Sequence, residues 1–148
     1  MDQAQELAFA LDTFYFLICG ALVMWMAAGF SMLEAGLVRA KNTTEILTKN
    51  LALFAISCTM YMVVGYEIMY SGNEFGMFLN KMADAADFTY AKPADFFFQV
   101  VFVATAMSIV SGAVAERMKL WAFLAFAVVM TGFIYPMEGS WTWGGAKV

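Results

Sequence analysis

One segment of the chain, Asp95 to Lys119, carries aromatic rings and an amide on a single face. At about 3.6 residues per helical turn, Phe98 and Phe102 lie one turn apart, with Gln99 at the edge of their face. Aromatic faces attract cations, and an amide oxygen can accept a hydrogen bond from one. The same pattern is typical of an aromatic girdle at headgroup depth. The spacing alone favours the girdle.

Catalytic and metal chemistry have few candidates in this chain. There is no histidine, and both cysteines, Cys19 and Cys58, lie in apolar segments, where a thiol behaves as a small apolar residue. We therefore expect no enzyme, no metal or cofactor site and no disulfide framework. The pair Glu116 and Arg117 is interpreted as an anchor at a helix end, in preference to a proton path. The same interpretation is given to a second polar group: Glu34, Arg39, Lys41 and Asn42.

Four charge-free runs predict the helices that would position these aromatic and polar residues. They cover 13–33, 50–66, 96–115 and 120–137, and each is close to the ~20 residues that a helix needs to cross a bilayer. A soluble helical bundle would keep a charged face, which these runs lack. We predict an all-α transmembrane bundle with four spans, at about 13–38, 47–71, 95–115 and 119–137, and an external loop at 72–94.

Basic residues set the predicted orientation. They gather between spans one and two and between spans three and four, whereas the first residues carry only acids. By the positive-inside rule, the N-terminus then lies outside and the two short turns face the cytoplasm. The acidic start also argues against a signal peptide. Net charge is −4 without a basic patch, so no nucleic-acid partner is expected.

Small residues predict where helices pack closely. One stripe lies on the third span and consists of Ala104, Ser108, Ser111 and Ala115. A comparable stripe lies on the first span and consists of Ala21, Ala28, Gly29 and Ala35.

Three motifs resemble the Amt/Mep/Rh ammonium transporters. They are GFSMLEAGLVRAKN from Gly29, FFQVVF followed by SGAVAERMK in the third span, and WTWGG from Trp141. They occur in that family's order, and the resemblance covers essentially the whole chain. It implies that residues 1–148 are the N-terminal part of a single transmembrane domain, the first four of eleven spans, in a protein that forms homotrimers. The family's pore histidine would then lie beyond Val148.

The resemblance also implies a function and a set of site residues. Ammonium, or methylammonium as its analogue, would be recruited at an outer vestibule by Trp143, Phe98 and Phe102, and would cross as neutral ammonia. Phe102 would match the upper of two stacked rings that gate the pore, and Gln99 would give polar support. The expected location is the bacterial inner (plasma) membrane, with the lipid bilayer as partner. The alternatives are an ammonium sensor with the same fold and a non-transporting four-helix membrane fragment.

Overall fold

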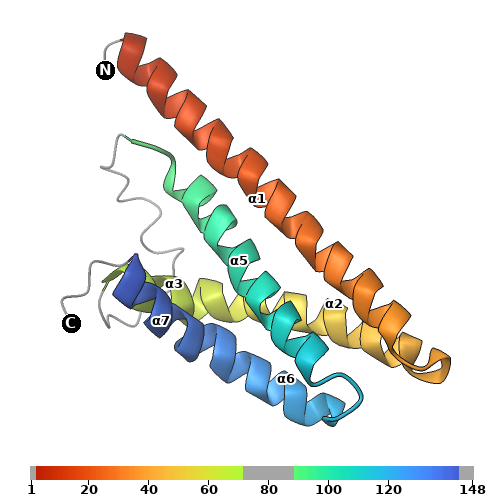
Figure 1. The fold of residues 1–148 in the computed structure, drawn as a ribbon. Coiled ribbons are helices and arrows are strands. Elements are labelled where there is room, and N and C mark those ends of the chain that lie inside the picture. The colour runs from red at the N-terminus through yellow and green to blue at the C-terminus, as the bar shows by residue number, and fades with distance from the viewer. Residues whose placement is uncertain (1–2, 72–88, 144–148) are drawn as a thin grey trace.

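A computed structural model describes residues 3–71 and 89–143, which are helical apart from short turns (Figure 1). The elements, in chain order, are α1 (Gln3–Leu37), η1 (Ala40–Asn42), α2 (Thr43–Met60), η2 (Tyr61–Gly65), α3 (Tyr66–Ser71), α5 (Lys92–Ala113), α6 (Leu120–Val129), η3 (Met130–Ile134) and α7 (Tyr135–Thr142). The segments η2 and η3 are π-helical and run on into α3 and α7. They therefore join short helices into longer rods.

Four of these rods are long and apolar enough to cross a membrane: Gln3–Leu37, Ala40–Tyr70, Lys92–Ala113 and Leu120–Thr142. The predicted all-α, four-span architecture is thus confirmed. α1 begins ten residues before its charge-free run, because Glu6 lies in the first turn, where the helix dipole favours an acid. Of the expected loop at 72–94, residues 72–88 lie outside the described residues, and α5 already begins at Lys92 with Pro93 in its first turn.

α5 is the central helix and packs against both α1 and α2. Three of the four residues in its predicted small-residue stripe are buried: Ala104 and Ser111 are fully enclosed and Ser108 is 3% exposed. The fourth, Ala115, lies beyond the end of α5 and is only partly buried. The predicted stripe on α1 does not take part, because Ala21 and Ala28 are exposed. The contact face of α1 instead contains Gly20, where a Cβ would lie 2.7 Å from the Phe97 ring.

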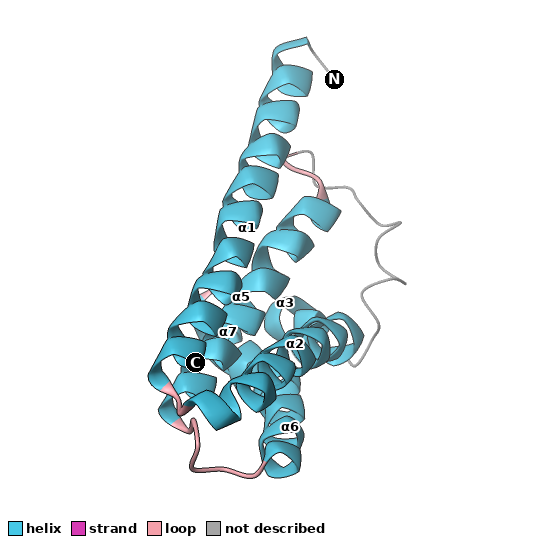
Figure 2. Cartoon of the chain, turned by 90° about the vertical axis from the view of Figure 1, so that its right-hand side faces the viewer, coloured by secondary structure: helices cyan, strands magenta, loops and turns pink. Residues whose placement is uncertain are grey.

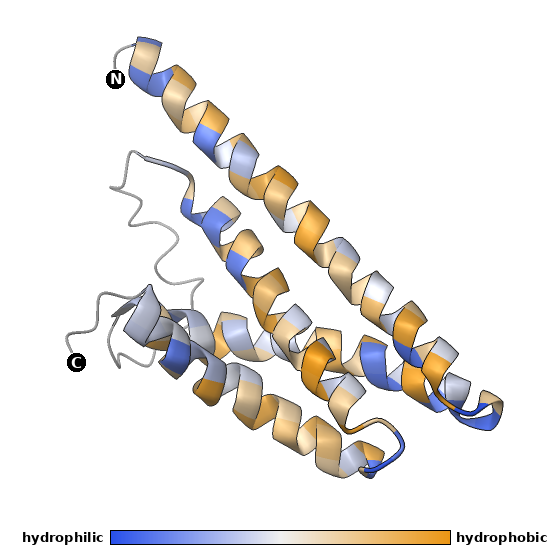
Figure 3. Ribbon diagram, in the orientation of Figure 1, coloured by the Kyte–Doolittle hydropathy of each residue, from blue (hydrophilic) through white to orange (hydrophobic). Residues whose placement is uncertain are grey.

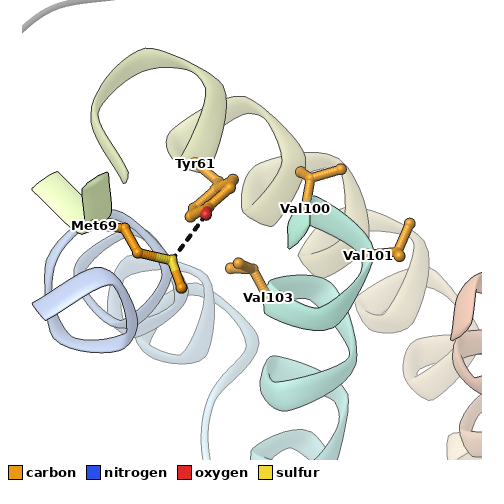
Figure 4. Close-up of a cluster of buried hydrophobic side chains, with 5 residues drawn as sticks. All are labelled: Tyr61, Met69, Val100, Val101 and Val103. Carbon is orange, nitrogen blue, oxygen red and sulfur yellow. Dashed lines mark hydrogen bonds between the residues drawn. The ribbon is translucent and has the colours of Figure 1, made fainter. Parts of the chain in front are cut away.

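Two apolar clusters hold the rods together. The first contains Tyr61, Met69, Val100, Val101 and Val103, from η2, α3 and α5 (Figure 4). Within it, the Tyr61 hydroxyl donates to the Met69 sulfur at 3.0 Å, so the buried phenol is not left without a partner. The second cluster contains Leu53, Met107, Phe123 and Ala127, from α2, α5 and α6.

The two π-helical segments pack against each other. Pro136 explains the wide turn in η3, because proline has no N–H for the ladder and its ring clashes with the carbonyl four residues earlier. Gly65 allows the approach: a Cβ there would lie 2.5 Å from Tyr61 Cδ2 and 3.0 Å from Pro136 Cγ. The crossing is therefore fixed by one proline and one glycine.

The rods are apolar along most of their length, with hydrophilic residues gathered mainly near the helix ends (Figure 3). Trp25 and Trp121 are 74% and 81% exposed. The first turns of α1 extend beyond the other helices (Figure 2), and only 11% of its most apolar window is buried. Such continuous apolar surface is unfavourable in water and suits a bilayer.

Candidate functional site

A cavity of about 530 Å3 lies beside the N-terminal half of α5. Its wall is built from α1, α3, α5, α7 and the segment before α5. The lining residues are Phe16, Tyr70, Tyr90, Asp95, Phe98, Gln99, Phe102, Tyr135 and Trp143. All four residues singled out from the sequence (Phe98, Gln99, Phe102 and Trp143) thus line one cavity.

Aromatic rings form a continuous wall of this cavity. Phe98 and Phe102 are one turn apart on α5, and their centroids are 4.9 Å apart with the planes at 69°. The ring of Phe16 on α1 meets the Phe98 ring edge to face, with centroids 5.3 Å apart. It meets the Tyr90 ring in a tilted arrangement, with centroids 4.7 Å apart. Edge-to-face pairs place the positive rim of one ring against the negative face of the next. The aromatic face of α5 is therefore turned toward a cavity wall built with α1.

Trp143 lies at the rim of the cavity. It is the C-cap of α7, and its backbone N–H donates to the Gly139 carbonyl at 2.8 Å. Its side chain is 71% exposed, so the indole face is accessible. The glycines that follow it in the WTWGG motif lie outside the described residues.

Polar groups occupy the wall between α5 and α3. Asp95 is 6% exposed, and its Oδ2 accepts a hydrogen bond from the Tyr66 hydroxyl at 2.8 Å. Gln99 lies one turn after Asp95 on α5 and lines the cavity together with Asp95 and Tyr70. An amide in the wall of the cavity suits the polar support expected of Gln99.

Sequence reasoning missed five lining residues. Asp95 had a usable signal, since it lies one turn before Gln99 on the same helix. Phe16, Tyr70, Tyr90 and Tyr135 come from other elements, so no spacing along α5 points to them.

The opposite end of the bundle is held by Glu116. The two short turns meet there, at the lower right of Figure 1, and Glu116 adopts a left-handed conformation with φ 59°. Its Oε1 accepts from the Arg39 backbone N–H at 3.0 Å, from Arg39 Nε at 3.2 Å and from Asn42 Nδ2 at 2.6 Å. These bonds, led by the backbone one, lower the pKa of Glu116. The geometry supports a helix-end anchor, with Arg39 as the partner in place of Arg117.

Glu34 departs from the predicted helix-end network. It is 3% exposed, and its Oε2 lies 3.2 Å from the Lys49 ammonium and accepts from the Ser111 hydroxyl at 2.9 Å. Lys49 also donates to the Ser111 carbonyl at 3.2 Å and lies 5.1 Å from the centre of the Phe123 ring. The prediction that Glu34 belongs with Arg39 is therefore wrong, because the carboxylate points into the bundle and neutralises a lysine from α2.

No group of three metal-ligating side chains comes together within residues 3–71 and 89–143. The candidate site in this part of the chain is accordingly an aromatic cavity with polar groups from α3 and α5 in its wall. The side chains that line this cavity suit a small cation, since aromatic π-faces and an acid both attract positive charge.

Comparison with known proteins identifies the family of this chain. The model of the Ammonium Transporter Family matches residues 14–148. Ammonium transporter Amt2 of Archaeoglobus fulgidus is 42% identical over 91% of this chain and 29% of its own length. Ammonium transporter 3 of Dictyostelium discoideum is 42% identical over 96% of this chain and 33% of its own.

A solved structure titled Sensor Amt Protein superposes with a TM-score of 0.86 at 29% identity, covering 95% of this chain and 36% of that one. The chain thus spans about a third of the length of the relatives it matches. The Archaeoglobus and Dictyostelium relatives are named as transporters, not as enzymes, which agrees with the expected class. The resemblance seen in the three motifs is confirmed: the chain belongs to the ammonium transporter family and is a multi-pass membrane protein.

Proposed function

We propose that this chain forms the recruiting vestibule of a protein that carries ammonium or ammonia across the plasma membrane, the inner membrane of a bacterium. The observation that carries the proposal is the cavity in which Trp143, Phe98, Phe102 and Gln99 meet. In the orientation that the positive-inside rule predicts, the N-terminus and the cavity face the outside of the cell. The two turns held together by Glu116 then face the cytoplasm, as their basic residues favour.

The positive charge of ammonium is the physical obstacle to its passage across the membrane. A bare cation in an apolar interior is very costly, whereas neutral ammonia avoids that cost. A cation over an aromatic face gains roughly 0.5 to 2 kcal/mol, so the rings can replace part of its lost hydration. In this proposal Trp143 and Phe98 hold the cation at the rim, and deprotonation precedes the apolar part of the path.

Phe102 is proposed as the gate below this vestibule. Its ring lies 4.9 Å from that of Phe98, one turn further along α5 toward the bundle interior. A ring in this position excludes water from the path until the cation has lost its proton. The opposing ring, the proton relay and the rest of the pore wall would come from segments beyond these 148 residues, in a complete protein that assembles as a homotrimer in the bilayer.

A sensor is the second candidate function, and the specific observation in its favour is the likeness to the Sensor Amt Protein structure. A sensor needs the same recruiting cavity but no continuous path. Binding of ammonium without flux would identify it.

The test is uptake of labelled methylammonium by cells that express the longest continuous reading frame containing this chain. Saturable uptake that ammonium competes away supports a transporter. A frame that is well expressed and inserted, with Trp143 and Phe102 intact, yet supports no uptake would exclude transport. The size of the purified protein in detergent addresses the fragment alternative. A non-transporting fragment would aggregate or be degraded, whereas a complete protein would elute as one oligomer.

A further inference from the structure

We propose that Asp95 supplies the negative charge of a cation subsite inside the aromatic cavity, so that a carboxylate and π-faces bind ammonium together. This inference rests on the proposed function, because it assigns a charge partner to the same cavity. It goes further in naming electrostatic attraction by this chain's own acid as the source of affinity.

The charge balance around Asp95 is the first support. Among the described residues that line the cavity, Asp95 is the only charged one, and it is nine-tenths buried. The ion pairs within residues 3–71 and 89–143 join Arg39 to Glu116 and Lys49 to Glu34, and neither reaches Asp95. A buried carboxylate is costly unless a cation or several hydrogen bonds compensate it. A small cation in the cavity would provide that compensation.

The fixed geometry of Asp95 is the second support. The Tyr66 hydroxyl donates to Oδ2 at 2.8 Å, and the Tyr66 ring is itself held by Phe96 at 5.6 Å and Tyr61 at 6.0 Å. A neutral donor orients the carboxylate without removing its charge. The acid is therefore held in place in the cavity that Phe98 and Phe102 also line, before any cation arrives, which reduces the entropic cost of binding.

A purely structural role is the competing explanation, in which Asp95 serves only as the acceptor for Tyr66. Asp95→Asn separates the two explanations. The amide oxygen of Asn can still accept from Tyr66, and the shape is nearly unchanged, but the charge is lost. A structural role predicts little change in cation affinity, whereas the proposed subsite predicts a large one.

The experiment measures methylammonium binding to the purified protein that the longest continuous reading frame encodes, reconstituted in nanodiscs. Uptake by cells that express the same protein is measured in parallel. For Asp95→Asn we expect the dissociation constant and KM to rise about tenfold, equivalent to about 1.4 kcal/mol, with the maximal rate nearly unchanged. Asp12→Asn is the matched control, because Asp12 is an exposed carboxylate on α1 that does not line the cavity. It should bind as the wild type does.

A charge-shift variant keeps the test decisive if Asp95→Asn is poorly produced. Gln99→Glu adds a carboxylate one turn from Asp95 and should lower the dissociation constant several-fold. Binding that is unchanged in either variant overturns the subsite, while saturable uptake by the wild type would leave transport standing. Binding that depends on Asp95 without any flux supports the subsite and removes transport. No binding by the wild type overturns both.

Discussion

The carboxylate of Glu34 and the ammonium of Lys49 lie 3.2 Å apart in the interior, with side chains 3% and 8% exposed. They join the end of α1 to the beginning of α2, and the Ser111 hydroxyl and carbonyl tie both to α5. Three of the four membrane-spanning rods are thus linked by one ion pair. Because both side chains are buried, the two charges depend on each other.

Removing one charge should therefore cost more than removing both. We expect Glu34→Gln to lower the free energy of unfolding by about 3 to 5 kcal/mol, since it leaves Lys49 buried without its counter-charge. The double variant Glu34→Gln, Lys49→Met should recover much of this loss. Unfolding in denaturing detergent measures both, with the exposed Glu6→Gln as control. Equal losses in the single and double variants would contradict the mutual dependence.

The Glu116 anchor should make stability depend on pH. Its pKa is lowered in the folded protein from an ordinary value of 4.5. A carboxyl of this kind stabilises the fold above its unfolded pKa, and the contribution is lost as the pH falls through the lower folded pKa. We expect the thermal unfolding midpoint of the wild type to decrease as the pH is lowered below 4.5. The midpoint of the Glu116→Gln variant should depend less on pH. Parallel profiles for the two proteins would argue against the anchor.

The crossing of the π-helical segments gives a packing prediction. A Cβ at Gly65 would meet Tyr61, Pro136 and the Thr131 carbonyl at 2.5, 3.0 and 3.2 Å. Gly65→Ala should destabilise the protein by about 1 to 3 kcal/mol, as overpacking does. Gly36→Ala is the control, because nothing lies within 4 Å of its Cβ, and it should be neutral or slightly stabilising. Equal thermal midpoints for both variants would contradict the close crossing.

The fold was predictable in outline because a bilayer demands long apolar helices. Four charge-free runs were enough to give four spans and their order. The π-helical turns in the second and fourth rods were not predicted from the sequence. Pro136 was a local signal for the one at Met130–Ile134, whereas no proline marks the one at Tyr61–Gly65. Prediction from the sequence also misplaced Glu34, because a carboxylate near a basic turn is expected to face water, and only the position of Lys49 on α2 shows otherwise.

The site was predictable only on α5. Phe98, Phe102 and Gln99 share a helix, so their relation follows from the helical period. Trp143 could be added through the family resemblance but not by spacing. Phe16 and Tyr90 reach the cavity from two other segments, and no pattern in a single sequence reports such a contact. The charged member, Asp95, was within reach because it lies one turn from Gln99.

Phe102 offers a separate test of the gate. Replacing its ring by alanine would open the path to water and to hydrated cations of similar size. We expect Phe102→Ala to make methylammonium uptake several-fold more sensitive to inhibition by potassium, with Phe126→Ala, an exposed phenylalanine on α6, as control. Unchanged sensitivity to potassium in Phe102→Ala would exclude the proposed gate.

The most direct measurement compares the KM for methylammonium uptake in Trp143→Leu and Trp121→Leu. Trp143 lines the rim of the cavity, whereas Trp121 is 81% exposed on α6 and does not line it. Loss of a cation–π contact of roughly 0.5 to 2 kcal/mol predicts that KM rises about 2-fold to 30-fold in Trp143→Leu and stays unchanged in Trp121→Leu. An equal KM in the two variants and the wild type would contradict recruitment of the cation at this cavity.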